Sequence, residues 1–270
     1  MKVLLINNLT LCGHGRLGIP TSLVHLGSML RKQPGVGLEG LRDVEVAIAT
    51  VDERRPGMQT VDTLRKHSPD VVGIGVYEQN VGSVGLILER VRAIGPKICT
   101  IVGGPFATIM PKTTLAKTGA DVLCRGEADF TFRKVIERMA RREDALGIEG
   151  VMTRDRNGTI HEHAKSGETP ILSLAEMTAI EPNRELILET IQTGEYGYLP
   201  VLTARGCPFN SCSFCKEGSN WRRLDSDNTK RRIRNMMDAN TCLTIGIDDS
   251  SFGGPAGKLK ELLAAMHGSF

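Results

Sequence analysis

The run Val71-Val72-Gly73-Ile74-Gly75-Val76 determines the fold that we expect for the first half of this chain. It is short, apolar throughout and rich in valine and isoleucine, which is typical of a strand covered on both faces of a parallel sheet. Similar runs recur before and after it, at residues 2–7, 44–51, 98–102 and 121–124.

Helical patterns separate these runs, at residues 21–31, 60–66, 83–93, 113–118 and 131–141. Strands that alternate with helices predict a doubly wound α/β domain with a Rossmann-like parallel sheet. In this architecture ligands bind at the carboxyl ends of the strands. The loops at those ends are residues 7–18, 77–80, 103–108 and 125–127. The glycines of Gly103-Gly104-Pro105 would allow close approach of a bulky ligand, and the same tripeptide is also compatible with a simple turn.

Length and composition exclude several classes of protein. The chain has 270 residues, 40% of them hydrophobic and 24% charged, and a net charge of +3 from 34 basic and 31 acidic side chains. This balance excludes a disordered chain and a strongly basic nucleic-acid-binding protein. No apolar run approaches the roughly 20 residues of a membrane-spanning helix, and none resembles a secretion signal. We expect a soluble, cytoplasmic protein without a membrane partner.

The second half has a different pattern. A hairpin is predicted at residues 150–153 and 159–163 around the turn Asp155-Arg156-Asn157-Gly158. Residues 173–183 are interpreted as a linker. A strand at 198–203, a helix at 226–238, a strand at 242–247 and a helix at 258–266 follow.

Gly13-His14-Gly15-Arg16-Leu17-Gly18 fits the dinucleotide pattern G-x-G-x-x-G, but it is displaced from the preceding strand and Pro20 precedes the expected helix. We give it little weight.

The cysteines are more informative. Three of the seven fall within nine residues, in Arg205-Gly206-Cys207-Pro208-Phe209-Asn210-Ser211-Cys212-Ser213-Phe214-Cys215. Three thiolates on a short loop can hold a soft metal centre. A structural zinc site needs a fourth ligand, for which Cys242 is the nearest candidate. An iron–sulfur cluster with three cysteines leaves one iron open for chemistry, and we favour this alternative.

This arrangement resembles the radical S-adenosylmethionine (SAM) superfamily, which binds a four-iron–four-sulfur (4Fe-4S) cluster through three cysteines and cleaves SAM to a 5′-deoxyadenosyl radical. Phe214 stands at the aromatic position before the last cysteine. The spacing departs from the common C-x3-C-x2-C, because four residues separate Cys207 from Cys212. The resemblance implies that Cys207, Cys212 and Cys215 hold the cluster.

The first half resembles the cobalamin-binding domain that precedes many radical SAM enzymes, through Pro69 to Val76, Val102 to Thr108 and Arg125-Gly126-Glu127. The resemblance implies a corrinoid over the strand ends, against Tyr77, Glu78, Gly103, Gly104, Pro105, Gly126 and Glu127. The cobalt-ligating D-x-H-x-x-G motif is absent, and Cys12 stands two residues before His14 in place of the aspartate. We therefore expect cobalt without a histidine ligand.

Other candidate residues have competing interpretations. Asp248 and Asp249 end a strand and, with Phe214, are candidate SAM contacts, although a strand-end turn explains the two aspartates equally well. The basic run from Arg222 to Arg234 is interpreted as a solvated helix face rather than a site for an acidic substrate or nucleic acid. The four scattered cysteines are expected to be small buried apolar residues: Cys12, Cys99, Cys124 and Cys242.

We thus expect a cobalamin-binding domain at residues 1–145, a hairpin and linker at 146–197, and the first part of a partial (β/α) radical SAM barrel at 198–270. The last 73 residues hold two βα units and are too short for a third.

Two classes of function follow: a cobalamin-dependent radical SAM enzyme, most plausibly a methyltransferase that acts on an unactivated carbon, or a corrinoid- and cluster-binding module without catalysis. The expected partners are a small-molecule or peptide substrate, an electron donor such as flavodoxin or ferredoxin, and a second chain that completes the barrel.

Overall fold

A computed structural model describes most of the chain, namely residues 1–9, 17–31, 41, 43–52, 56–163, 169–193, 196–209, 211–215, 220–239, 244–252, 257, 260–261 and 263–264. Cys12, His14 and Cys242 lie outside these residues, as does much of the helix expected at 258–266. Within the described part, no helix combines the length and the apolar character needed to cross a membrane.

The larger of the sheets contains seven of the described strands, in the order β3-β1-β4-β5-β6-β7-β8. The first five are parallel, and the hairpin β7–β8 continues the sheet in the antiparallel sense. Their bounds are β1 Lys2–Leu9, β3 Glu45–Asp52, β4 Val71–Gly75, β5 Cys99–Gly103, β6 Val122–Cys124, β7 Val151–Arg154 and β8 Ile160–Glu162. The strand order reverses between β1 and β4, which is where sheets of this kind bind ligands.

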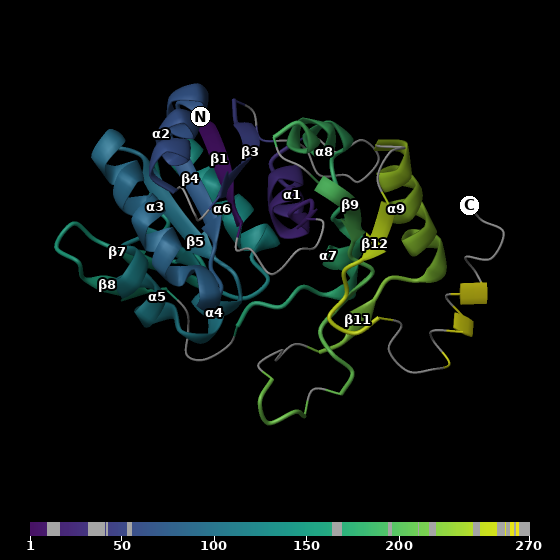
Figure 1. The fold of residues 1–270 in the computed structure, drawn as a ribbon. Helices are drawn as coiled ribbons and strands as arrows, with labels where there is room; N and C mark the ends of the chain where they lie inside the picture. Colours follow the sequence, from purple (N-terminus) through teal and green to yellow (C-terminus); the bar gives the residue numbers. More distant parts are fainter. Residues whose placement is uncertain are drawn as a thin grey trace.

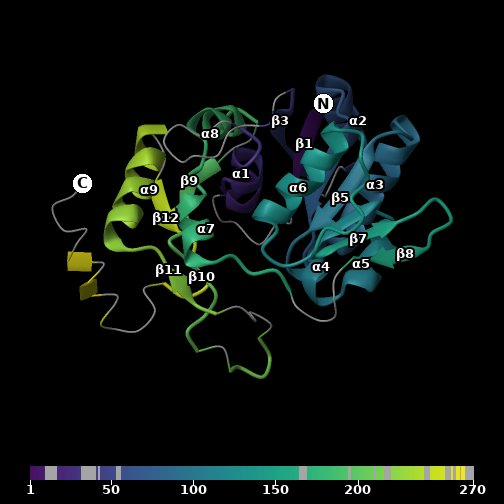
Figure 2. The same ribbon diagram turned by 180° about the vertical axis from the view of Figure 1, so that it is seen from behind.

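Helices cover both faces of this sheet, as Figures 1 and 2 show from opposite sides. One face carries α2 Pro56–His67, α3 Val81–Ile94 and α5 Pro111–Thr118, and the other carries α6 Asp129–Ala140 and α1 Thr21–Ser28. Alternate residues of β1 belong to the two cores: Leu4 and Ile6 to one, Val3 and Leu5 to the other. The strand is buried on both faces, as its composition predicts.

A smaller parallel sheet stands beside the larger one in the order β12-β9-β2. Its strands are β9 Tyr196–Val201, β12 Thr244–Ile247 and β2 Leu17–Gly18. α9 Ser226–Ala239 packs against β9 and β12, and α8 Arg184–Ile191 packs between α9 and β3 of the larger sheet. β2 comes from the segment that follows β1, so the first half of the chain contributes an edge strand to the second sheet. Gly18 is needed there because a Cβ would lie 2.6 Å from the ring of Tyr198.

One hydrophobic core joins the two sheets. Val3 and Leu5 of β1 belong to the same cluster of buried side chains as Leu199 of β9 and Ile233 of α9. α1 lies between the sheets in both views (Figures 1 and 2) and contributes Leu23 to this cluster. The position of the smaller sheet is therefore tied to the larger one by shared apolar packing.

A third, two-stranded sheet consists of β10 Ala204–Arg205 and β11 Arg222–Arg223, paired antiparallel with Arg205 opposite Arg222. We call this pair of strands the cysteine-loop stem, because the segment between them carries Cys207, Cys212 and Cys215. The loop extends below β11 in Figure 1.

The expected strands of the larger sheet and the hairpin are confirmed to within a few residues. The linker expected at residues 173–183 is wrong, because α7 Leu174–Ala179 lies within it. The hydroxyl of Ser173 accepts a hydrogen bond from the backbone N–H of Glu176, whose side chain returns to the backbone of Ser173. This capping box is visible in the sequence as S-x-x-E, and the flanking prolines Pro170 and Pro182 concealed it.

Two glycines with positive φ test how tightly the chain is packed beside the strand ends. Gly126 has φ +72°, and a Cβ there would lie 2.3 Å from the carbonyl oxygen of Pro170. Gly147 has φ +78° with no atom within 4 Å. We expect Gly147→Ala to lower the free energy of unfolding by about 1–2 kcal/mol from backbone strain alone, and Gly126→Ala by about 2–5 kcal/mol because overpacking adds to that strain. Urea unfolding measures both, and equal losses would contradict the packing described here.

Candidate functional site

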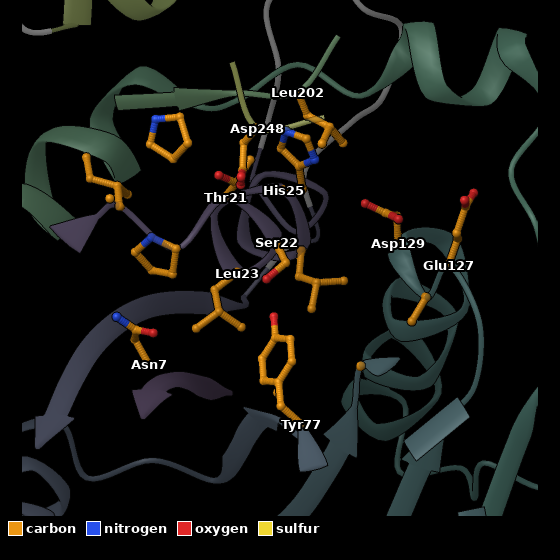
Figure 3. A pocket seen from close by; sticks show the side chains of 18 of the residues that line it. Asn7, Thr21, Ser22, Leu23, His25, Tyr77, Glu127, Asp129, Leu202 and Asp248 are labelled. Carbon is orange, nitrogen blue, oxygen red and sulfur yellow. The ribbon is translucent and has the colours of Figure 1, made fainter. Parts of the chain in front are cut away.

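A cavity of about 460 Å³ lies at the carboxyl ends of the larger sheet, between that sheet and the smaller one. Asn7 and Asn8 from the end of β1, Tyr77 after β4, and residues 126–129 after β6 line one side. Thr21, Ser22 and His25 of α1, with Tyr198, Arg205 and Asp248 from the second half of the chain, line the other. Figure 3 labels several of these side chains around the cavity and shows Tyr77 directed towards Ser22. The cavity occupies the point of strand reversal, as expected for this fold.

A second, more apolar cavity of about 260 Å³ adjoins the first. It runs over one face of the larger sheet beneath α1 and is lined by backbone and side chains of β4 and β5, with Phe132 of α6. Tyr77, Ser22 and Gly104 line both cavities. The larger cavity thus has a mixed polar and apolar lining, and the smaller cavity beside it is mostly apolar.

The glycines at the strand ends have a structural reason that the sequence left open. Gly104 has φ +99°, and a Cβ there would lie 3.1 Å from the carbonyl oxygen of Val76. The chain turns tightly at this point and enters α4 Pro105–Ile109. The turn also lines both cavities, so the two interpretations of Gly103-Gly104-Pro105 are compatible.

The seven candidate cobalamin residues are mostly brought together. Tyr77, Gly104, Gly126 and Glu127 line the larger cavity, and Gly103 and Pro105 join Tyr77 and Gly104 in the smaller one. Glu78 differs: its side chain is exposed, in the short 3-10 helix Glu78–Asn80, and lines neither cavity.

Tyr77 is an accessible side chain of the larger cavity, with 41% of its surface exposed. Burial of the hydroxyl, followed by the negative charge of Asp248, raises the pKa of Tyr77, and a hydrogen bond with Ser22 acts in the opposite direction. The phenol is therefore a neutral hydrogen-bonding group at physiological pH.

Asp248 and Asp249 have different surroundings although they are adjacent. Asp248 lines the larger cavity beside Thr21 (Figure 3), and burial together with the charge of Asp249 raises its pKa. The carboxylate of Asp249 accepts hydrogen bonds from the backbone N–H groups of Thr203, at 2.6 Å, and Ala204, at 2.8 Å, and from the Thr203 hydroxyl. Asp249 thus holds the beginning of the cysteine-loop stem.

The three clustered cysteines lie on the loop beyond the stem. Cys207 and Cys212 are half-buried and Cys215 is exposed, as is Phe214, with 87% of its surface accessible. Within the described part of the chain, no three His, Cys, Asp or Glu side chains gather into a metal-binding group. Cys124 and Cys99 are different: burial raises the pKa of both thiols to about 12, in agreement with their expected role as small apolar residues.

Sequence reasoning missed a buried polar network on the wall of the larger cavity. The guanidinium of Arg205 donates to both oxygens of Asp129, at 2.8 and 3.1 Å, and lies 3.3 Å from Nδ1 of His25. His25 is 2% exposed, and burial, followed by the charges of Arg205 and Arg232, lowers its pKa to about 3. Since Nδ1 of this neutral ring faces a donor, the ring proton belongs on Nε2.

A second buried ion pair lies beside the first. Both terminal nitrogens of Arg222 donate to Glu127, at 2.7 and 2.8 Å, and Glu127 also accepts from the backbone N–H of Leu172, at 2.7 Å. The position of Arg205 two residues before the first cysteine was the available sequence signal. Asp129 lies 76 residues before Arg205 along the chain and Glu127 lies 95 residues before Arg222, so the sequence alone could not pair these acids with the arginines.

The expectation of a solvated basic face at residues 222–234 is wrong for three of its members: Arg222, Arg223 and Arg232. The side chain of Arg223 is 6% exposed and lies 3.8 Å from Glu261. Arg222 forms the ion pair above, and Arg232 is 1% exposed. The guanidinium of Arg232 donates to the carbonyl oxygens of Leu202, Met177 and Ile180, and burial lowers its pKa to about 10. Arg232 faces inward because its side of α9 packs against α7 and the strand that leads to the stem. Arg222 lies on β11 instead.

Comparison with known proteins shows which proteins this chain resembles. The family model of the B12 binding domain matches residues 16–136. A protein of Pyrococcus horikoshii named an uncharacterized methyltransferase is 25% identical over 213 residues, which cover 77% of this chain and 43% of that protein. The hopanoid C-3 methylase of Methylococcus capsulatus is 26% identical over 250 residues, which cover 86% of this chain and 45% of the methylase.

A solved structure extends the likeness to the whole fold. The cobalamin-dependent SAM radical enzyme OxsB, with aqua-cobalamin bound, matches with a TM-score of 0.72 at 20% identity, over 99% of this chain and 37% of OxsB. The chain spans less than half the length of these three proteins. Its fold is that of cobalamin-binding radical SAM proteins, and the resemblance indicated by the sequence is confirmed.

The neutral state of His25 predicts a pH dependence. In the unfolded chain its pKa returns to about 6.5, so below that pH the unfolded state binds a proton that the folded state excludes, and stability falls as the pH falls towards 3. The free energy of unfolding is measured in urea at pH 7 and at pH 5. It should fall by about 2 kcal/mol more in the wild type than in His25→Gln. Equal losses would show that His25 is protonated in the folded chain.

Proposed function

We propose that this chain binds cobalamin and a 4Fe-4S cluster and takes part in SAM-dependent radical chemistry, most plausibly methyl transfer to an unactivated carbon. The observation that carries the proposal is the position of the larger cavity. It lies where a B12-binding sheet reverses its strand order, and its wall at residues 126–129 is joined by ion pairs to both strands of the cysteine-loop stem.

The two cavities fit a corrinoid. The amide of Asn7 and the hydroxyls of Ser22 and Tyr77 are suited to the carboxamide side chains that surround a corrin ring. The smaller apolar cavity is suited to a planar aromatic base such as the one on the nucleotide tail of cobalamin. His25 is directed to Arg205 and buried, which supports the expectation that cobalt has no histidine ligand from this wall.

The donor set of the cysteine loop fits an iron–sulfur cluster. Cys207, Cys212 and Cys215 are three soft donors in a short segment between paired strands, and Asp249, Arg205 and Arg222 fix both ends of that segment. Metal binding commonly orders the segment that supplies its ligands, so thiols that are apart without metal are compatible with this assignment.

Asp248 is the residue of this chain best placed to contact SAM in the cavity. Its carboxylate lines the cavity and could accept hydrogen bonds from a ribose hydroxyl or an ammonium group. Asp249 would act indirectly, because its oxygens already hold Thr203 and Ala204. Phe214, which precedes Cys215 on the loop, would be a further contact for SAM.

When bound, the cluster would supply the electron that cleaves SAM, and cobalamin would supply a methyl carrier. An electron donor such as flavodoxin or ferredoxin, a small-molecule or peptide substrate, and a second chain that completes the barrel remain part of this proposal. The cavity residues Leu23 and Leu202 would exclude water from the space between the two groups.

A corrinoid- and cluster-binding module without catalysis is the alternative, and it rests on the observation that the chain spans less than half the length of the proteins it resembles. Product formation distinguishes the two: an enzyme generates 5′-deoxyadenosine or a methylated product from SAM, and a module generates neither.

Anaerobic reconstitution tests the proposal. With iron, sulfide and hydroxocobalamin, the wild type should bind one cobalamin and about four iron atoms. Cys207→Ala, Cys212→Ala and Cys215→Ala should each lose the iron and keep the cobalamin. Cys99→Ala, a control outside the linings of both cavities, should keep both. Electron paramagnetic resonance, metal analysis and an assay for 5′-deoxyadenosine supply the readouts. Zinc instead of iron, lost also in Cys242→Ala, would contradict the proposal in favour of a structural zinc site.

A further inference from the structure

Each strand of the cysteine-loop stem has an arginine at the end nearest the loop. The side chains of both arginines reach the same segment of the first half of the chain. Arg205 of β10 and Arg222 of β11 are cross-strand partners. Their guanidinium groups bind Asp129 and Glu127, which are two residues apart after β6. Arg205 also lies 3.9 Å from Glu127, so the four charges form one cluster.

The cluster is largely shielded from water. The exposed side-chain fractions are 14% for Arg205, 6% for Asp129, 12% for Arg222 and 16% for Glu127. Both pairs are two-pronged, with two N–H groups directed at two carboxylate oxygens. Such pairs fix orientation as well as distance.

The acidic residues are themselves held firmly in place. The backbone N–H of Gly126 donates to the hydroxyl of Thr108, at 2.9 Å, and the N–H of Glu127 to the carbonyl of Pro170, at 2.9 Å. Asp129 begins α6, which packs on the larger sheet. Residues 126–129 also line the larger cavity. One rigid segment therefore forms the cavity wall and the anchor of the stem.

We propose that Glu127 and Asp129 are positioning residues that set the place of the cysteine loop relative to the larger cavity. This inference rests on the proposed function, in which the loop and the cavity hold two groups that must face each other. A buried ion pair is weak evidence for stability, because its desolvation offsets much of its attraction, but its geometry is specific. The expected effect of breaking it is a displaced or mobile stem in a folded protein.

The chain contains a built-in reporter for this test. Trp221 is its single tryptophan and immediately precedes Arg222. Bound cobalamin absorbs in the range of tryptophan emission, so energy transfer from Trp221 reports the distance from the stem to the cavity. Backbone hydrogen exchange at Leu224, whose N–H donates to the carbonyl of Thr203 at 2.9 Å, reports the closure of the stem without any cofactor.

We call Glu127 and Asp129 together the clamp. The clamp variants are Glu127→Gln and Asp129→Asn, with Glu181→Gln as the matched control. Glu181 is also a buried acid paired with an arginine at 2.7 Å, but that arginine, Arg231, belongs to α9 and not to the stem. If loss of the buried Asp129 charge prevents folding, Glu127→Gln carries the test, since Glu127 is the more exposed of the two.

Each clamp variant should accelerate exchange at Leu224 by about tenfold or more, while amides of β1 and the whole Glu181→Gln protein exchange as in the wild type. Quenching of Trp221 by saturating hydroxocobalamin should decrease in the clamp variants and not in the control. Unchanged exchange and quenching, or stem and β1 amides that accelerate together, would overturn the inference. Absence of cobalamin quenching in the wild type would instead contradict the proposed function, and the Leu224 exchange would still decide whether the clamp anchors the stem.

Discussion

Four charged side chains lie almost out of water where the cysteine-loop stem meets the larger sheet. Arg205 and Arg222 cannot be buried there unless carboxylates neutralise them, because an unpaired charge in such surroundings is strongly unfavourable. Asp129 and Glu127 meet this requirement with two-pronged hydrogen bonds. The stem must therefore lie against residues 126–129, and through them against the cavity at the strand ends. The rest of the candidate site follows from this placement.

The same constraint explains why the two sheets behave as one structure. β2 brings the segment that follows β1 into the smaller sheet. α1 lies between the sheets: its Leu23 packs in the hydrophobic core that the sheets share, and its His25 lines the larger cavity. Asp249 then holds the first strand of the stem from the side of β12. Cavity and cysteine loop are thus positioned by contacts from both halves of the chain. An ordinary flexible junction between two domains would leave the distance between them free.

Much of this fold could be predicted from the sequence, because strands such as Val71–Gly75 are apolar on both faces and the hairpin has a strong turn signal. The three cysteines and the strand-end glycines also indicated where the site lies. α7 was missed although its capping box is local, because the neighbouring prolines favoured a linker. The ion pairs of Glu127 and Asp129, and the inward position of Arg232, were beyond prediction, since they join residues that only the tertiary fold brings together. Glu78 lies in a strand-end loop, as the sequence predicts, but its side chain is exposed and lines neither cavity. A position in such a loop therefore does not determine which way a side chain faces.

The central claim is that the cavity and the cysteine loop hold two groups that face each other at close range. The most direct measurement is electron paramagnetic resonance of protein loaded with cob(II)alamin and a reduced cluster, recorded with each centre alone and with both together. The account predicts that the cob(II)alamin signal is broadened or split when the cluster is reduced, through interaction of the two unpaired spins, and that Cys212→Ala restores the isolated spectrum. An unperturbed cob(II)alamin signal in fully loaded protein would show that the two centres are far apart and would contradict the account.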